Sequence, residues 1–238
     1  MQRIFITGAG RGIGLELARQ YVQRGDRVLA GCRSLERAPA LRDLLTGHNG
    51  GLSVIPLEVK DTNSIVDAVR QAGKDIDGLD VLINNAAINP GDAQSMGPDG
   101  QPVLDASQAN EILHVNAVAP VVVAQSFLAL LRRGANPRVV NISSGAGSLT
   151  RKTDGGDYIY AASKAALNMF TRVLAGNMRG EGVTAVMINP GWVKTDMGGP
   201  NARLEPAESA RGLLSVIDGL TLADSGRFLS YDGSELPW

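Results

Sequence analysis

Short runs of apolar residues alternate with segments of helical periodicity along the whole chain. In these runs nearly every position is apolar, which is typical of strands buried on both faces. They predict strands at 3–7, 27–31, 52–57, 81–84, 138–142, 183–188 and 227–230. Apolar residues at the spacing of a helix face predict helices at 13–24, 35–45, 64–72, 107–131, 158–178 and 207–217. Glycine and proline between 89 and 102 predict a loop.

The order of these elements indicates the class of fold. Strands that alternate with helices form a parallel sheet, and right-handed crossovers place the helices on both faces. The sequence therefore predicts an α/β protein with one Rossmann-type, doubly wound parallel sheet of about seven strands. No linker, repeat or low-complexity segment divides the sequence, so we expect a single domain over residues 1–238.

Composition narrows the set of possible partners. The chain has 238 residues, 20% of them charged, and a formal net charge of -1, so no strong field attracts nucleic acid or an anionic membrane. Cys32 is the only cysteine, and no cysteine–histidine cluster has metal-ligand spacing. The N-terminus has no signal-peptide pattern, and no apolar run approaches the roughly 20 residues of a membrane-spanning helix. We expect a cytoplasmic protein without a metal site.

The first predicted strand leads directly into a glycine-rich turn. Gly8, Gly12 and Gly14 follow the pattern G-x-x-x-G-x-G between this strand and the first predicted helix. Glycines there allow backbone N–H groups to approach a pyrophosphate, and the helix N-terminus adds the positive end of its dipole. A tight turn that caps the helix would also explain the glycines, but the position at the first strand–helix junction favours a dinucleotide site.

The end of the second predicted strand indicates which dinucleotide binds. An acidic residue there would bond the ribose 2′-hydroxyl of NAD, but the strand is followed by Cys32, Arg33 and Ser34. Arg33 stands where a 2′-phosphate would lie, and Arg11 of the glycine turn can reach the same place. A guanidinium binds phosphate through paired, charge-assisted hydrogen bonds. Two solvated surface arginines are the alternative, but the missing carboxylate also favours NADP(H).

Two further segments carry groups suited to proton transfer. Tyr160 and Lys164 are four residues apart and therefore share one face of a predicted helix, where an ammonium stabilises a phenolate. Tyr158 has no lysine four residues on and is the weaker candidate. The fifth predicted strand ends at Ser143 and Ser144, at the edge of the sheet where such folds bind ligands. A turn-forming serine pair is the alternative, more plausible for Ser143.

Together these residues resemble the short-chain dehydrogenase/reductase family over essentially the whole chain. The family's markers occur in order: Thr7-Gly8, Gly12, Gly14, Asp61, Asn84-Asn85-Ala86, Asn116, Ser144, Tyr160, Lys164 and Pro190-Gly191. The segments 190–199 and 231–238 resemble the branch that contains C-factor and sniffer-type carbonyl reductases. The resemblance implies an NADPH-dependent oxidoreductase that reduces an aldehyde or ketone to an alcohol.

The resemblance also implies roles for the markers. Tyr160 would protonate the carbonyl oxygen as hydride leaves the nicotinamide, and Lys164 would assist it and bond the nicotinamide ribose. Ser144 would polarise the carbonyl, and Asn116 would position a water that relays protons to Lys164. The cofactor would be bound by Gly8, Arg11, Gly12, Ile13, Gly14, Arg33, Glu58, Val59, Asn85, Ala86, Tyr160, Lys164, Pro190, Gly191, Val193 and Thr195.

The chain departs from the family pattern in three places. The family usually has glycine where this chain has Ala87 and Ala119, and because each change adds only a methyl group we expect small backbone adjustments. A polar insert at 151–157 borders the expected substrate cleft. The substrates of better-known members are therefore not carried over.

The sequence leaves alternatives to the reductase activity, and it also gives an expectation for the oligomeric state. A cofactor-binding signalling or regulatory protein of the C-factor type, with little or no turnover, is the alternative to an enzyme, although an intact Ser-Tyr-Lys-Asn set favours catalysis. A sugar-nucleotide epimerase is disfavoured because little of the chain is left for a sugar-binding domain. Besides a small carbonyl or alcohol substrate, we expect a second copy as partner. The homodimer is predicted from small apolar residues in two long helices: Ala117, Ala119, Ala161, Ala165 and Ala166.

Overall fold

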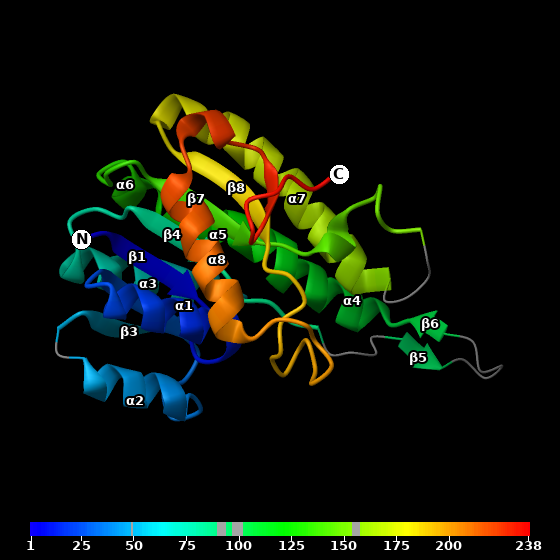
Figure 1. Ribbon diagram of the computed structural model, residues 1–238, viewed down its shortest axis with the longest axis horizontal. Helices are drawn as coiled ribbons and strands as arrows, with labels where there is room; N and C mark the ends of the chain where they lie inside the picture. Colours follow the sequence, from blue (N-terminus) through cyan, green and yellow to red (C-terminus); the bar gives the residue numbers. More distant parts are fainter. Residues whose placement is uncertain (49, 90–93, 97–101, 154–157) are drawn as a thin grey trace.

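A seven-stranded parallel sheet forms the centre of the molecule (Figure 1). The computed structural model describes residues 1–48, 50–89, 94–96, 102–153 and 158–238. The strands are β1 (Arg3–Thr7), β2 (Arg27–Cys32), β3 (Leu52–Pro56), β4 (Val81–Asn84), β7 (Arg138–Ile142), β8 (Thr184–Asn189) and β9 (Phe228–Ser230). Their order is β3-β2-β1-β4-β7-β8-β9, so the chain moves from β1 to one edge and returns on the other side. This is the doubly wound order, and it confirms the predicted fold class.

Helices cover both faces of this sheet (Figure 1). They are α1 (Gly12–Gln23), α2 (Pro39–Gly47), α3 (Thr62–Asp75), α4 (Ala106–Leu113), α5 (Ala119–Ser126), α6 (Leu128–Leu131), α7 (Tyr158–Met178) and α8 (Pro206–Gly219). One face packs against α1, α2 and α8, and the other against α3, α5, α6 and α7. The second helix begins at Pro39 instead of at 35, because the fixed φ of proline favours the first turn of a helix.

Each face of the sheet has its own hydrophobic core. Side chains of a strand point alternately to the two faces, and in β1 this places Ile4 and Ile6 in the core under α1 and α8. Phe5 points the other way and meets Phe127, with ring centroids 4.5 Å apart. Burial on both faces explains why the strands are apolar at nearly every position. Polar side chains that could bind a ligand therefore have room mainly at the carboxyl ends of the strands.

The structure divides the helix that was predicted at 107–131. A π-helical turn at His114–Val118 separates α4 from α5, and α6 follows α5 after a further break. Pro120 accounts for the wide turn, because proline has no N–H to donate to the carbonyl four residues earlier. That carbonyl belongs to Asn116. The predicted helix is therefore present over nearly its whole length, but it is not one regular α-helix. The irregular turn lies at a candidate catalytic residue, as such turns often do.

The predicted loop at 89–102 also differs from the structure. Part of it belongs to a two-stranded antiparallel ribbon of β5 (Gln94–Met96) and β6 (Pro102–Leu104). Proline is accepted at the first position of a strand, where its missing N–H is not needed. From residue 154 onward, the predicted polar insert at 151–157 lies outside the described residues.

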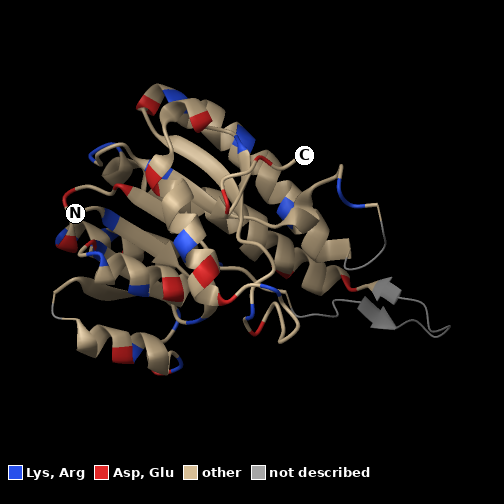
Figure 2. Cartoon of the chain, viewed as in Figure 1, with Lys and Arg blue, Asp and Glu red and all other residues tan. Residues whose placement is uncertain are grey.

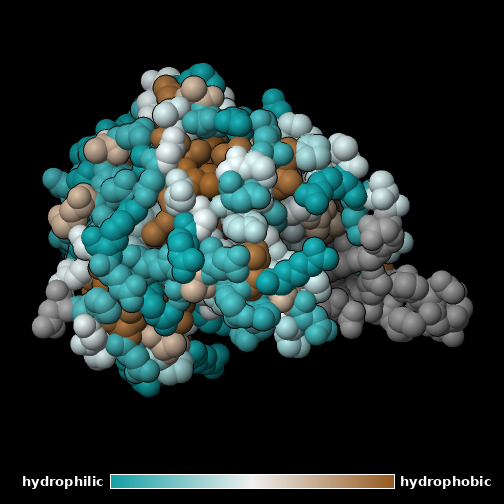
Figure 3. Space-filling view, viewed as in Figure 1, coloured by the Kyte–Doolittle hydropathy of each residue, from teal (hydrophilic) through white to brown (hydrophobic). Residues whose placement is uncertain are grey.

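Charge and hydropathy distinguish the sheet from its surroundings. Charged residues lie mainly in the helices and connecting loops, and the strands contain few of them (Figure 2). The face drawn in Figure 3 is mostly hydrophilic, with small, separate apolar areas. In the described part of the chain, no helix is both long and apolar enough to cross a membrane. Nor does that part contain three or more His, Cys, Asp or Glu side chains grouped so that they could hold a metal ion.

Candidate active site

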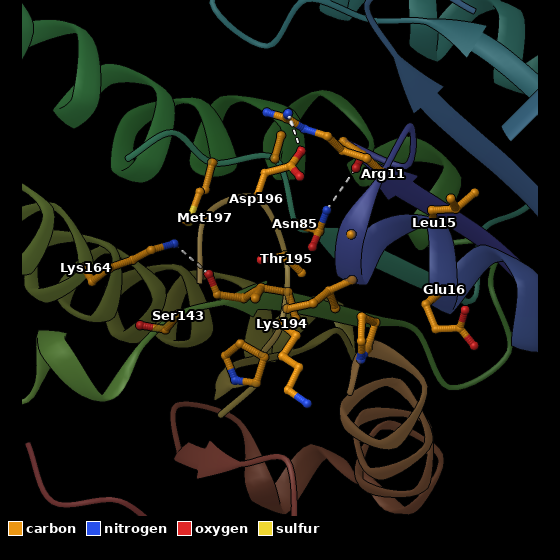
Figure 4. Close-up of a pocket in the computed structure, with 18 of the residues that line it drawn as sticks. Arg11, Leu15, Glu16, Asn85, Ser143, Lys164, Lys194, Thr195, Asp196 and Met197 are labelled. Carbon is orange, nitrogen blue, oxygen red and sulfur yellow. Dashed lines mark hydrogen bonds and ion pairs between the residues drawn. The ribbon is translucent and has the colours of Figure 1, made fainter. Parts of the chain in front are cut away.

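Hydrogen bonds join the carboxyl ends of β1 and β4. The Thr7 hydroxyl accepts from the backbone N–H groups of Asn85 and Ala86, both at 3.0 Å. The side-chain amide of Asn85 donates to the carbonyl of Thr7 at 3.1 Å. It also donates to the carbonyl of Gly8 at 3.1 Å (Figure 4). These four bonds hold the glycine turn against the segment after β4. Asn85 therefore supports this turn as well as facing the cavity beside it.

The glycine turn is too tightly packed for side chains. Gly8 has a φ of +67°, and a Cβ there would lie 2.8 Å from the Ala86 Cα. A Cβ at Gly14 would lie 2.4 Å from the Asn85 amide nitrogen. α1 begins at Gly12, which also has a positive φ and lines the cavity. Because Gly12 has no side chain, the backbone at the helix N-terminus faces the cavity directly. Such a turn fits the diphosphate of a dinucleotide, because its N–H groups and helix dipole favour an anion.

Tyr160 and Lys164 project from the first turns of α7. The Lys164 Nζ lies 5.8 Å from the centre of the Tyr160 ring. It donates to the Ile142 carbonyl at 2.8 Å (Figure 4). Lys164 is 2% exposed, and this burial lowers the pKa of its ammonium from 10.5 to about 8. Desolvation disfavours the charged form of an amine, which explains the direction. The lysine thus places an amine that readily exchanges a proton beside the tyrosine.

Asn116 is held in the π-helical turn by its side chain. Its Oδ1 accepts from the backbone N–H of Ile88 and its Nδ2 donates to the carbonyl of the same residue, both at 2.8 Å. Nδ2 also lies 3.1 Å from the Ser163 Oγ, which donates to the Tyr160 carbonyl. The amide therefore joins the segment after β4 to the helix that carries the tyrosine and the lysine.

The two serines after β7 have different surroundings. Ser143 is 2% exposed, and its hydroxyl donates to the Asn168 Oδ1 at 2.5 Å. Ser144 is half-buried, and its Oγ accepts from the N–H of Ala146 at 3.1 Å while its own O–H is a second hydrogen-bonding group. Ser143 lines the cavity but its hydroxyl is bonded to Asn168, whereas Ser144 follows it and does not line the cavity. The choice of Ser144 as the serine that meets the substrate therefore stays a prediction.

The segment after β8 forms the opposite wall. Gly191 has a φ of +80°, and a Cβ there would lie 2.4 Å from Leu204, so the chain turns sharply before Thr195. The Thr195 Oγ1 accepts from the N–H of Gly198 at 3.1 Å. Asp196 forms a 2.7 Å ion pair with Arg11 of the glycine turn (Figure 4). Arg11 therefore faces the segment after β8, a partner that the sequence did not indicate.

These walls enclose a cavity of about 450 Å³ at the carboxyl edge of the sheet (Figure 4). Of the predicted site residues, it is lined by Gly8, Arg11, Gly12, Ile13, Asn85, Ala86, Tyr160, Lys164, Pro190 and Thr195. The structure thus brings together residues from the segments after β1, β4 and β8 and from the helices α1 and α7. In open α/β sheets, ligands bind at this edge.

The other predicted residues do not line the cavity. Gly14 packs against Asn85 and Gly8, and Gly191 and the buried Val193 belong to the segment after β8. Ser144 directly follows the lining residue Ser143, and Asn116 is bonded to Ile88 and Ser163. The remaining three follow neighbouring strands on the far side of β1: Arg33 after β2, and Glu58 and Val59 after β3. Arg33 is exposed there. The predicted residues thus extend along the sheet edge from β3 to β8.

Some lining residues were not predicted. Glu16 and Arg19 continue the helix face that begins at Gly12, at i+4 and i+7, and this spacing was a signal that could have found them. Lys194 and Asp196 lie beside the predicted Thr195, but nothing local in the sequence shows which of them faces the cavity. The other unpredicted lining residues are Leu15, Ala87, Ile142, Ser143, Met197 and Pro206.

Fold and site together define a nucleotide-binding α/β protein with a tyrosine–lysine pair, and comparison with known proteins identifies its family. The chain matches the short chain dehydrogenase family model over residues 2–205. It is 46% identical to the C-signal of Myxococcus xanthus over 160 residues, which cover 67% of this chain and 93% of that protein. The chain therefore belongs to the short-chain dehydrogenase family of nicotinamide-dependent oxidoreductases.

Solved structures agree with this assignment. An NADPH-bound carbonyl reductase from chicken fatty liver has a TM-score of 0.90 at 34% identity, covering 100% of this chain and 99% of that one. The carbonyl reductase Sniffer of D. melanogaster has a TM-score of 0.91 at 32% identity, covering 100% of both chains. With the C-signal match, these similarities confirm the predicted resemblance to the C-factor and sniffer-like branch.

Proposed function

We propose that this protein is an NADPH-dependent carbonyl reductase that converts an aldehyde or ketone into an alcohol. The observation that carries the proposal is that Tyr160 and Lys164 line the same cavity as the glycine turn and Thr195. A proton donor thus adjoins a turn that fits a dinucleotide. The two carbonyl reductases of the same fold support this choice of reaction.

Each catalytic side chain has a separate task in this proposal. NADPH supplies the hydride that adds to the carbonyl carbon. The Tyr160 hydroxyl gives its proton to the carbonyl oxygen, and the buried ammonium of Lys164 favours the loss of that proton. The Ser144 O–H donates to the same oxygen and stabilises the negative charge that develops on it.

Asn116 completes the proposed site through its position in the π-helical turn. Its side-chain amide is bonded to Ile88 and Ser163, so we assign the binding of a relay water to its main-chain carbonyl. Pro120 has no N–H to offer this carbonyl. Protons would then reach Lys164 from solvent by way of that water.

The proposed preference for NADPH rests on Arg33. It is exposed just after β2, and no carboxylate stands at the end of that strand. A guanidinium there binds the 2′-phosphate, whereas a carboxylate would bind the 2′-hydroxyl of NAD. Arg11 is paired with Asp196, so we assign the 2′-phosphate to Arg33 first. The carbonyl reductase from chicken fatty liver was solved with NADPH bound.

The similarity to the C-signal of Myxococcus xanthus supports a second candidate, a cofactor-binding signalling protein with little turnover. The tyrosine–lysine pair beside the cavity favours the enzyme, because a protein that only binds cofactor has no use for a proton donor. Absorbance of NADPH at its reduced-nicotinamide band, followed with aldehydes, ketones and quinones, distinguishes the two. Binding without oxidation of NADPH by any of them would favour the signalling protein.

Replacing the proposed acid tests the mechanism. Tyr160→Phe should fold and bind NADPH but lose roughly 10²- to 10⁴-fold in kcat, the usual contribution of a positioned acid. Tyr158→Phe is the matched control, because that tyrosine lies in the same helix turn and is 66% exposed. A Tyr160→Phe variant with wild-type kcat would show that another group supplies the proton.

We also propose that the protein forms a homodimer. Ala117 and Ala119, on which the prediction partly rested, are 1% exposed and are not available to a partner. Apolar side chains of α7 are the better candidates, because Met169, Phe170 and Val173 are 62%, 41% and 55% exposed. Neighbouring exposed apolar side chains often mark an interface between subunits.

A further inference from the structure

A buried side chain of α7, that of Asn168, forms hydrogen bonds to the turn that carries Ser144. We infer that Asn168 is a positioning residue that fixes the Ser144 hydroxyl relative to Tyr160 and Lys164. This inference rests on the proposed function, since it gives Asn168 a part in the same reaction. Asn168 is 3% exposed and does not line the cavity. It therefore acts through Ser144 and not on the substrate.

Asn168 bonds both ends of this turn. Its Oδ1 accepts from the Ser143 hydroxyl at 2.5 Å, just before Ser144. Its Nδ2 donates to the Gly147 carbonyl at 3.3 Å, at the end of the short 3-10 turn that follows. Because one planar amide makes both bonds, the two ends cannot move apart without breaking one of them.

Close packing brings the same turn against α7. A Cβ at Gly147 would lie 2.7 Å from the Lys164 carbonyl carbon and 2.9 Å from the Ala165 nitrogen. Only a glycine allows this approach, so backbone meets backbone beside the lysine. Asn189 at the end of β8 accepts from the N–H of Gly145 at 3.1 Å and holds the opposite side. The turn is therefore located by groups outside itself.

The helix geometry explains why this attachment matters for the reaction. Tyr160, Lys164 and Asn168 are spaced four residues apart in α7, so they follow one side of a single rigid helix. Ser144 comes from a different element, the end of β7. A hydroxyl that misses its position by about 1 Å can lose about 10²-fold in rate, so this relative position needs a support. Asn168 provides it from the helix that already carries the acid.

A double-mutant cycle with Ser144 tests the inference. Asn168→Leu keeps the approximate volume of the side chain but makes neither bond, and we expect kcat to fall about 10- to 100-fold, as for lost supporting hydrogen bonds at other sites. The dissociation constant of NADPH should change less than twofold. In a Ser144→Ala background the same substitution should leave kcat nearly unchanged, because the hydroxyl that it positions is gone.

Thr171→Val is the matched control. Thr171 is 0% exposed in the same helix and also makes two buried hydrogen bonds, accepting from Asn141 and donating to the Leu167 carbonyl. It should lower the melting temperature as Asn168→Leu does, yet keep kcat. Should Asn168→Leu not fold, Ser143→Ala removes one of the two bonds with little change in volume, and we expect a smaller loss of kcat in the same direction.

Two results would overturn the inference. One is an unchanged kcat in Asn168→Leu or Ser143→Ala, and the other is an equal fold-loss with and without the Ser144 hydroxyl. Amide hydrogen exchange over residues 144–148 gives a readout that does not need turnover. It should accelerate about tenfold in Asn168→Leu and not in Thr171→Val, since exchange follows local opening. If the wild type reduces no carbonyl, the proposed function fails, and unchanged exchange would separately reject the attachment by Asn168.

Discussion

Replacing Lys164 with methionine should make the protein without cofactor more stable near neutral pH. Burial lowers the pKa of this amine from 10.5 to about 8. Each tenfold change in proton binding is worth about 1.4 kcal/mol, so the buried ammonium costs the folded state about 3 kcal/mol below pH 8. Methionine has a similar length and carries no charge. It leaves the Ile142 carbonyl without its 2.8 Å donor, which costs about 1 kcal/mol.

The net expectation at pH 7 is a gain of about 2 kcal/mol in the free energy of unfolding of Lys164→Met. The gain in stability of the variant over the wild type should decrease as the pH rises. Between pH 8 and 10.5 the unfolded chain holds the Lys164 proton and the folded chain has released it, so wild-type stability rises with pH. The difference between variant and wild type should therefore shrink by about 3 kcal/mol across this window.

Urea unfolding of both proteins from pH 7 to pH 10, without cofactor, measures this difference. Other titrating groups are common to the two proteins and cancel. A difference that stays constant over the whole range would refute the assignment of a low pKa to Lys164. The variant should also lose carbonyl reduction, because the ammonium that assists Tyr160 is missing. A gain in stability with a loss of activity would show that the chain tolerates this buried charge for its chemistry.

Three further outcomes are expected. Arg33→Asp should shift the ratio of kcat/KM for NADPH over NADH by about 10- to 100-fold toward NADH, the worth of a charged hydrogen bond, and an unchanged ratio would remove Arg33 from the account of cofactor choice. Gly14→Ala should weaken NADPH binding at least tenfold in a fluorescence titration, because its Cβ would lie 2.4 Å from the Asn85 amide, whereas Gly176→Ala meets nothing within 4 Å and should bind normally. Light scattering should give the mass of a dimer, and Phe170→Lys should give that of a monomer; a monomeric wild type at micromolar concentration would contradict the proposed assembly.

Local patterns in the sequence were sufficient for much of the fold. Strands buried on both faces need apolar residues throughout, so the continuous apolar runs in the sequence predicted the positions of the strands. The glycine turn after β1 was equally clear, because Gly8 adopts a φ of +67° that other residues rarely adopt. Tyr160 and Lys164 were paired from their spacing alone. In each case the physical requirement acts within a few residues of the chain.

The long helix shows where local patterns were insufficient. Its apolar periodicity continues through residues 107–131, but Pro120 removes one donor and the π-helical turn at Asn116 results. Proline within a helix signals a break, yet not its form. Nor does the local pattern show that the Asn116 amide in this turn makes two bonds to Ile88, which follows another strand.

What the sequence determined by itself was the order of strands and helices, the bare turn for a diphosphate, and the residue types available for proton transfer. The tertiary structure alone decided which of those residues meet. It paired Arg11 with Asp196, buried Lys164 so that its pKa falls, and placed Asn168 across the turn that carries Ser144. Such contacts join residues from separate elements. Their geometry and desolvation arise only when the sheet and its helices pack together, so no local pattern encodes them.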